Sequence, residues 1–288
     1  MKRPGKSFVL RAFLALAAVA FAAVVYVYLT LPDVRALATT NPSSTAFMEL
    51  RQREAERAGQ PLRHVHEWVP YSHISPHLKR AVLVAEDSAF WQHEGIDLEQ
   101  IKASIETAIE RGGTIRGAST ITQQLAKNLY LSPSRDPFRK VRELIITRRL
   151  EAALTKARIL EIYLNVVEWG DGIWGAEAAS RAYFGVTASA LSPQQAALLA
   201  GALINPIRYS PAHPPARLVR RQRIILGRMG AVEPPQPEVS AAAPAWSPAD
   251  VPIEIIGDAP PGDRKNADPG DESSAPPPAG APVVDPPA

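Results

Sequence analysis

Two carboxylates stand side by side in the segment EDSAFWQHEG, residues 86–95. Glu86 and Asp87 follow an apolar stretch and come just before the aromatic pair Phe90 and Trp91. Apolar and aromatic surroundings raise the proton affinity of a carboxylate, which is what a general acid or base acting on a sugar hydroxyl needs. A helix cap or an ion pair with Arg80 would explain the same carboxylates without catalysis. The segment therefore indicates a catalytic site only if other segments supply a place for substrate.

A second segment, GASTITQQLAKN at residues 117–128, is typical of a helix that begins with a Ser/Thr cap. The start of such a helix offers free N–H groups to an anion. One turn further on come donors for phosphate or sugar hydroxyls, namely Gln123, Gln124, Lys127 and Asn128. A solvated polar helix face is the alternative interpretation. Gly112 and Gly117 have the spacing of a nucleotide-binding loop, but Ala118 replaces its lysine, which argues against nucleotide binding.

Positive charge gathers just after this segment, within residues 127–142. The cations are Lys127, Arg135, Arg139, Lys140 and Arg142. Glu143 lies four residues after Arg139, so a helical salt bridge explains part of the pattern. The cluster nevertheless holds more positive charge than Glu143 balances. A doubly charged leaving group would balance the remainder.

The fourth segment, residues 156–175, has the apolar stripe of a core helix. Its polar residues, Glu161, Asn165 and Glu168, are interpreted as helix caps or internal ties.

In order and spacing, these four segments resemble the motifs of the glycosyltransferase domain that monofunctional peptidoglycan glycosyltransferases share with class A penicillin-binding proteins. The resemblance extends from about residue 31 to 185, and more loosely to about 209. It implies a mainly α fold with a lysozyme-like large lobe and a small jaw lobe next to the membrane. It also implies transfer of a growing glycan from polyprenyl pyrophosphate to the 4-hydroxyl of lipid II, forming β-1,4 links with inversion.

By position, the resemblance implies that Glu86 is the catalytic base and Glu143 the second essential carboxylate. It places the donor pyrophosphate on Lys127, Arg135 and Arg139. The remaining predicted substrate-binding residues are Asp87, Ser119, Thr120, Gln123, Gln124, Asn128 and Lys140. No tightly bound cofactor and no protein cage for a metal are expected, although a divalent cation such as Mg²⁺ can share the donor pyrophosphate.

The N-terminal part predicts a membrane anchor. Residues 12–31 carry no charge, and about 20 helical residues span the roughly 30 Å hydrocarbon core. Positive residues precede this run, so residues 1–11 are expected in the cytoplasm and the rest on the periplasmic side of the inner membrane. Cleavage of a signal peptide after Ala38 is the alternative, and both interpretations export the domain.

Residues 32–231 are expected to form the glycosyltransferase domain. Helix starts are predicted at Ser75, Asp97 and Ser192, the first and last followed directly by proline. An apolar stripe follows Asp97, made of Leu98, Ile101, Ile105 and Ile109. No alternating strand of convincing length is present, so the domain is predicted to be mainly α.

Residues 232–288 hold 15 of the 28 prolines and have two basic against ten acidic residues. This composition predicts a disordered acidic tail. Because the whole chain has a net charge of +3, residues 1–231 carry 3 + 8 = +11. Such a basic body suits an anionic partner such as phosphate or a membrane surface.

Two other functions fit parts of the sequence: a lysozyme-like enzyme that cleaves peptidoglycan, and a non-catalytic scaffold for wall assembly. The lytic enzyme does not need the cation cluster, and the scaffold does not need intact Glu86 and Glu143. Transpeptidase activity is excluded because no Ser-x-x-Lys or Lys-Thr-Gly motif occurs. The chain has no cysteine, and its six histidines form no helical metal pair. Expected partners are lipid II, lipid-linked glycan, the membrane and other wall-synthesis proteins, but no nucleic acid.

Overall fold

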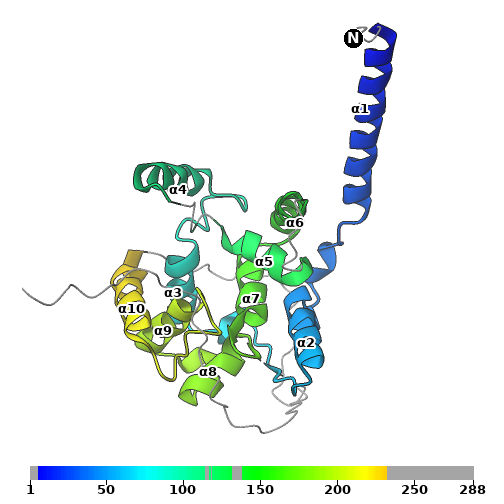
Figure 1. The fold of residues 1–288 in the computed structure, drawn as a ribbon. Helices are drawn as coiled ribbons and strands as arrows, with labels where there is room; N and C mark the ends of the chain where they lie inside the picture. Colours follow the sequence, from blue (N-terminus) through cyan, green and yellow to red (C-terminus); the bar gives the residue numbers. More distant parts are fainter. Residues whose placement is uncertain (1–5, 114–116, 118, 132–137, 232–288) are drawn as a thin grey trace, which may run out of the picture. The chain divides into compact units, whose positions relative to one another are not determined.

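The computed structural model describes residues 6–113, 117, 119–131 and 138–231, and helices dominate this part of the chain (Figure 1). The mainly α fold predicted from the sequence is confirmed. The helices in the first half of the described chain are α1 (Lys6–Leu29), α2 (Ala46–Ala58), α3 (Pro76–Glu86), α4 (Leu98–Arg111) and α5 (Ile121–Tyr130). The later helices are α6 (Arg139–Ala153), α7 (Lys156–Val166), α8 (Ala176–Phe184), α9 (Pro193–Ala202) and α10 (Ala216–Arg228). Single 3₁₀ turns are η1 (Arg35–Ala38), η2 (Tyr71–His73), η3 (Ala188–Ala190) and η4 (Met229–Ala231).

A small sheet that the sequence did not predict joins residues far apart in the chain. Its strands are β1 (Val65–His66), β2 (Glu168–Gly170) and β3 (Ile173–Trp174), in the order β1-β3-β2. Strand β3 pairs parallel to β1 and antiparallel to β2. Strands of two or three residues are too short to produce the alternating pattern on which strand prediction depends.

The predicted helix starts are confirmed. Ser75 accepts a hydrogen bond from the backbone N–H of His77 at 3.2 Å. Thr120 and Ser192 each form a reciprocal capping box, with Gln123 and Gln195 respectively. Asp97 accepts from the backbone N–H of Gln100, but Gln100 Oε1 is buried without a hydrogen-bond partner among the described residues. Asp97 and Gln100 therefore form only half of a capping box.

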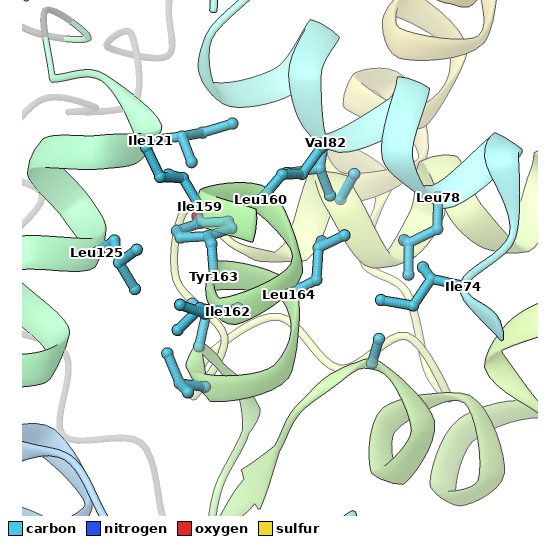
Figure 2. Close-up of a cluster of buried hydrophobic side chains, with 14 of the residues drawn as sticks. Ile74, Leu78, Val82, Ile121, Leu125, Ile159, Leu160, Ile162, Tyr163 and Leu164 are labelled. Carbon is cyan, nitrogen blue, oxygen red and sulfur yellow. The ribbon is translucent and has the colours of Figure 1, made fainter. Parts of the chain in front are cut away.

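Helix α7 lies at the centre of the hydrophobic core. Five of its hydrophobic side chains have no exposed surface, namely Ile159, Leu160, Ile162, Tyr163 and Leu164. They pack against Ile121 and Leu125 of α5 and against Leu78 and Val82 of α3 (Figure 2). A fully buried aliphatic side chain contributes about 1.5–3 kcal/mol. Because α3 and α5 both pack into this core, the two helices that carry the first two motifs are fixed near each other.

Helices α3, α9 and α10 also contact one another. Leu218 and Ile225 are the buried residues of α10. This contact brings the C-terminal helix of the described chain to the end of α3, where Glu86 is located.

The apolar stripe predicted on α4 is not a core face. Leu98 is 71% exposed and Ile109 is 76% exposed, while Ile105 is also exposed. Phe138 and Val141, at the start of α6, are exposed as well. The apolar period correctly predicts a helix here, but periodicity gives no information on what covers the apolar face.

Helix α1, Lys6–Leu29, covers most of the predicted membrane anchor at residues 12–31. Among the described residues, however, no helix is both long and apolar enough to span a membrane. The predicted transmembrane helix is therefore not confirmed. The predicted acidic tail, residues 232–288, lies outside the described part of the chain.

Candidate active site

Glu86 is the last residue of α3, and its carboxylate is held at both oxygens. Gln124 on α5 donates from Nε2 to Oε2 of Glu86 at 3.0 Å. Arg221 on α10 donates from Nη2 to Oε1 at 3.3 Å. The Glu86 side chain is only 15% exposed. Three helices thus position a single, nearly buried carboxylate.

Opposing effects set the proton affinity of Glu86. Burial raises its pKa, because the charged form loses hydration. The hydrogen bond from Gln124 and the charges of Arg221 and Lys127 act in the opposite direction. The net pKa is raised. A carboxylate with a raised pKa and stable hydrogen bonds to its charged form is suited to accept a proton from a hydroxyl.

Arg221 is a site residue that the sequence analysis missed. Its Nη2 also donates to the backbone carbonyl of Ala85 at 3.1 Å, so the guanidinium closes over the end of α3. Arg221 lies three residues after buried Leu218 and four before buried Ile225. This spacing puts Arg221 on the inner face of α10, a signal in the sequence that would have found it.

Asp87, the residue after Glu86, joins the first motif to the second. Its Oδ1 accepts from His93 Nε2 at 3.0 Å, and its Oδ2 accepts from the backbone N–H of Ile121 at 2.9 Å. Ile121 is the first residue of α5, where a carboxylate is also favoured by the helix dipole. Both oxygens of buried Asp87 are therefore used within the protein. The prediction that Asp87 binds substrate remains untested.

Gly95 explains why the first motif ends in glycine. Its φ is +82°, and an added Cβ would lie 2.6 Å from Thr147 Cγ2 of α6. A side chain at this position would be strained and would clash with α6. Gly95 also accepts a hydrogen bond through its carbonyl from Thr120 Oγ1 at 2.7 Å. The end of the first motif is therefore packed directly on the helices that carry the other motifs.

Most predicted substrate ligands of the second motif point into the protein. Thr120 and Gln123 are buried and cap α5. Asn128 is buried and donates to the Gln124 carbonyl at 2.8 Å. Ser119 is exposed, whereas Gln124 holds Glu86. Of these residues, the described contacts bring only Gln124 into direct contact with the predicted base.

The cation cluster lies on α5 and α6. The expected ion pair was Arg139 with Glu143, but the pair found links Lys140 Nζ to Glu143 Oε1. Glu143 is buried, while the Lys140 side chain is 63% exposed. Arg135, the remaining predicted pyrophosphate ligand, lies outside the described residues.

Lys127 connects the cation cluster to Glu86. Burial lowers the pKa of Lys127, and the nearby charges of Arg139 and Lys140 lower it further. The charges of Glu143 and Glu86 have the opposite effect. Lys127 thus lies within electrostatic reach of both predicted catalytic carboxylates. A bound polyanion would favour its charged form in the same way as these carboxylates do.

Among the described residues, three side chains lie close enough to one another to be considered as metal ligands. Possible ligand atoms of Asp87, His93 and Asp97 lie within 4.8 Å of one another. The group does not fit a metal ion, because its atoms are already hydrogen-bonded. His93 donates from Nε2 to Asp87 and accepts at Nδ1 from the Gly95 N–H, which makes both ring nitrogens occupied.

The interpretation of the fourth segment as structural is confirmed. Glu161 pairs with Arg158 at 2.7 Å, and Glu168 pairs with Arg51 of α2 at 3.1 Å. Asn165 exchanges two hydrogen bonds of 2.9 Å with the backbone of Val69. The Glu161 pair lies within α7, whereas the Arg51 and Val69 contacts tie β2 and α7 to the N-terminal part of the domain.

A family model described as transglycosylase matches residues 51–230, which include every element of this site. The chain belongs to the transglycosylase family. It is 54% identical over 191 residues to a biosynthetic peptidoglycan transglycosylase of Aromatoleum aromaticum, covering 66% of this chain and 82% of that relative. Proteins of the same name from Azoarcus sp. and Nitrosospira multiformis are 51% and 47% identical over 197 and 195 residues. Each of these two alignments covers 68% of this chain and 85% of the relative.

Proposed function

We propose that this transglycosylase polymerises the glycan chains of peptidoglycan. It transfers the growing glycan from polyprenyl pyrophosphate to the 4-hydroxyl of lipid II and forms a β-1,4 link with inversion. The observation that carries this proposal is the placement of a nearly buried carboxylate, Glu86, within electrostatic reach of Lys127 and its basic neighbours. Such a site combines a proton acceptor with a binding place for an anionic leaving group.

Glu86 acts as the general base in this reaction. Its carboxylate takes the proton of the acceptor 4-hydroxyl while the oxygen forms a bond to the anomeric carbon of the donor. The bond from that carbon to the pyrophosphate oxygen breaks, and the pyrophosphate leaves with the bonding electrons. Attack from the face opposite the leaving group inverts the anomeric centre. A positioned base contributes about 10²–10⁴-fold to such a step.

Lys127, Arg135 and Arg139 hold the departing pyrophosphate, with Lys140 at the edge of the same cluster. Preorganised cations stabilise charge as it develops in the transition state. Glu143 keeps this cluster compact by pairing with Lys140 and by favouring the charged form of Lys127. Asp87, Ser119, Thr120, Gln123, Gln124 and Asn128 shape the cleft, several of them by supporting its walls.

A divalent cation such as Mg²⁺, when bound, would share the donor pyrophosphate with Lys127, Arg135 and Arg139 and help to neutralise its charge. The support for this arrangement is chemical: phosphate oxygens bind Mg²⁺ well, while the Asp87 group is occupied by internal hydrogen bonds. Polymerisation measured against added Mg²⁺, and after chelation, tests it. Full activity after chelation would contradict the proposal.

The enzyme works at the membrane, because both substrates carry polyprenyl tails. Exposed apolar side chains of α1, among them Phe13, Leu16 and Phe21, support attachment through this helix. We place residues 1–11 in the cytoplasm and the catalytic domain on the periplasmic side of the inner membrane. Accessibility of the domain to protease in intact spheroplasts, before and after lysis, tests this topology. If the domain in intact spheroplasts resisted protease as strongly as a cytoplasmic control protein does, the proposed topology would be contradicted.

The two-lobe organisation is proposed on similar grounds. The core around α3, α5, α7 and α9 forms a lysozyme-like large lobe. Exposed apolar residues on α4 and at the start of α6, Leu98, Ile109 and Phe138, suit a small jaw lobe beside the lipid. Photo-crosslinking from Leu98 to a lipid probe tests this assignment, with exposed Glu49 of α2 as the control position.

The decisive test uses purified protein in detergent or vesicles with lipid-linked disaccharide pentapeptide. We expect glycan polymer sensitive to muramidase digestion. A parallel reaction with finished peptidoglycan tests the lytic alternative, for which soluble muropeptides would appear instead. A protein that yields neither product would support the scaffold interpretation. Polymer without cleavage establishes the proposed function.

A further inference from the structure

A buried tyrosine lies directly behind the amide that holds Glu86. The hydroxyl of Tyr163 on α7 donates to Oε1 of Gln124 at 2.9 Å, and Gln124 Nε2 donates to Glu86 at 3.0 Å. The two contacts use opposite ends of one amide group. Tyr163 itself is fully buried among core side chains, including Ile159 and Ile162 (Figure 2).

The direction of the Tyr163 hydrogen bond is fixed by chemistry. An amide oxygen only accepts, so the hydroxyl donates to Gln124 Oε1. Burial raises the pKa of Tyr163 well above its usual value, and the charges of Glu86 and Asp87 raise it further. Tyr163 therefore stays protonated at any pH at which the enzyme works. A buried hydroxyl hydrogen without an acceptor would be unfavourable, which ties the hydroxyl to this acceptor.

We propose that Tyr163 is a positioning residue for the base, an inference that rests on the proposed function. The Tyr163 hydroxyl fixes the orientation of the Gln124 amide, so that the NH₂ group of the amide, and not its oxygen, faces Glu86. Gln124 transmits the effect, and Tyr163 does not touch substrate.

The orientation of this amide decides which form of Glu86 is favoured. With NH₂ toward Glu86, the amide donates to the carboxylate and favours the charged form, which is the base. With the amide rotated by half a turn, its oxygen faces Glu86. That arrangement repels a carboxylate and accepts a hydrogen bond from the protonated acid. Tyr163 thus selects the catalytically competent form of Glu86.

The other charged groups around Glu86 remain the same in either orientation. Arg221 on α10 and Lys127 on α5 both favour the carboxylate. Asp87, next in the chain, has its own partners in His93 and Ile121. Of the other helices packed on α3, α9 contains no charged residue, and no charged group of α7 is among those that shift the pKa of Glu86. The orientation of the amide is therefore a separate contribution to the pKa of Glu86.

The test is the Tyr163→Phe variant of the full chain, assayed for polymer formation over a series of pH values that covers the acid limb of the wild-type profile. Without the hydroxyl nothing holds the amide oxygen away from Glu86, so the rotated orientation becomes accessible and the apparent pKa of the base rises. Activity depends on unprotonated Glu86, and the acid limb of the kcat/KM profile should move up by about one pH unit, equivalent to roughly 1.4 kcal/mol. Well above that limb, activity should approach wild type, with KM for the lipid substrate unchanged.

Tyr183→Phe is the matched control, because this partly buried tyrosine donates to the Trp169 carbonyl at 3.3 Å, a contact that does not involve Gln124 or Glu86. It should leave the position of the acid limb unchanged. Equal activity losses at every pH in both variants would show a merely structural role and overturn the proposal.

A second variant keeps the test valid if Tyr163→Phe folds poorly. Gln124→Met removes both ends of the amide and should give the same upward shift, and adding Tyr163→Phe should then shift the limb no further. An unshifted limb in Gln124→Met, or additive shifts in the double variant, would overturn the proposal. Failure of the wild-type protein to form polymer would instead overturn the proposed function.

Discussion

The two halves of the candidate site use charge in opposite ways. Around Glu86, each carboxylate oxygen has its own donor, supplied by Gln124 and Arg221. Around Lys127, cations from α5 and α6 lie near one another, and the pair found is between Glu143 and exposed Lys140. The first half is internally balanced, whereas the second keeps an excess of positive charge.

This difference corresponds to what each half must bind. A base has to keep one position and one protonation state before substrate arrives, so its partners belong to the protein. A leaving-group site has to bind charge that substrate brings, so complete internal pairing would compete with pyrophosphate. The burial of Glu86 at the junction of α3, α5 and α10 fits the first requirement. The exposure of Lys140 fits the second.

The largest effect is expected from Glu86→Gln. The amide keeps the shape of the side chain but cannot accept the acceptor's proton, so polymerisation should fall by up to about 10⁴-fold. Binding of the lipid substrate should persist, measured by retention of labelled lipid II. Glu49→Gln, at an exposed position on α2, is the control. Polymer formation by Glu86→Gln at the wild-type rate would disprove the assignment of the base.

Arg139→Met should have the next largest effect, through the cation half. Losing one group that stabilises the leaving charge costs about 2–4 kcal/mol, or 10²–10³-fold in rate. Arg148→Met on the same helix is the control, because Arg148 is exposed and pairs with exposed Glu94. The measurement is kcat for polymer formation in both variants. A loss of the same size in Arg148→Met would show that charge on α6 in general, and not a leaving-group site, is responsible.

The sequence predicted those parts of the fold that depend on local chemistry. Ser75, Thr120 and Ser192 begin helices because a side-chain oxygen next to a helical pattern satisfies a free N–H group. The core role of the 156–175 segment follows from its apolar period. The small sheet was missed because its strands are too short to show an alternating pattern and because β1 pairs with β3 far along the chain. The apolar periodicity of α4 likewise could not predict that Leu98 and Ile109 are exposed.

A site residue could be predicted from the sequence where its role depends on its own motif. It could be predicted less well where its role depends on how the helices pack. Glu86 stood out beside its aromatic neighbours, and the structure gives it the expected nearly buried setting. Arg221 reaches Glu86, and Tyr163 reaches Gln124, only because α10 and α7 pack against α3 and α5. The pairing of Glu143 with Lys140 in place of Arg139 is also a matter of side-chain direction, which spacing alone leaves open.

Glu143→Gln should have an intermediate effect, about 10–10²-fold in rate, comparable with losing a hydrogen bond to a charged group. Glu143 favours the charged form of Lys127, so its removal lowers the pKa of that lysine. The alkaline limb of the pH profile should therefore move to lower pH. Lys140→Met is the control: the pair involves a largely exposed lysine and is worth at most about 1 kcal/mol. Equal effects of the two variants would reduce Glu143 to a salt-bridge partner.

Arg221→Met should have the smallest effect on the maximal rate and a clear effect on its pH dependence. The pKa of Glu86 is raised by burial, and Arg221 opposes that rise. Without the guanidinium the pKa increases further, so the fraction of unprotonated base falls first at low pH. We expect the acid limb to move up by about one pH unit, roughly 1.4 kcal/mol, with nearly normal activity well above it.

Arg223→Met, on the exposed side of the same helix, is the matched control for this shift. It removes the same charge from α10 without removing a donor to Glu86, so its acid limb should stay at the wild-type position. The two profiles thus separate a direct contact from the general basic field of the helix. If both variants shift equally, the field of α10 sets the proton affinity of the base. If only Arg221→Met shifts, the balanced half of the site depends on the Arg221 contact itself, as the two-donor geometry at Glu86 requires.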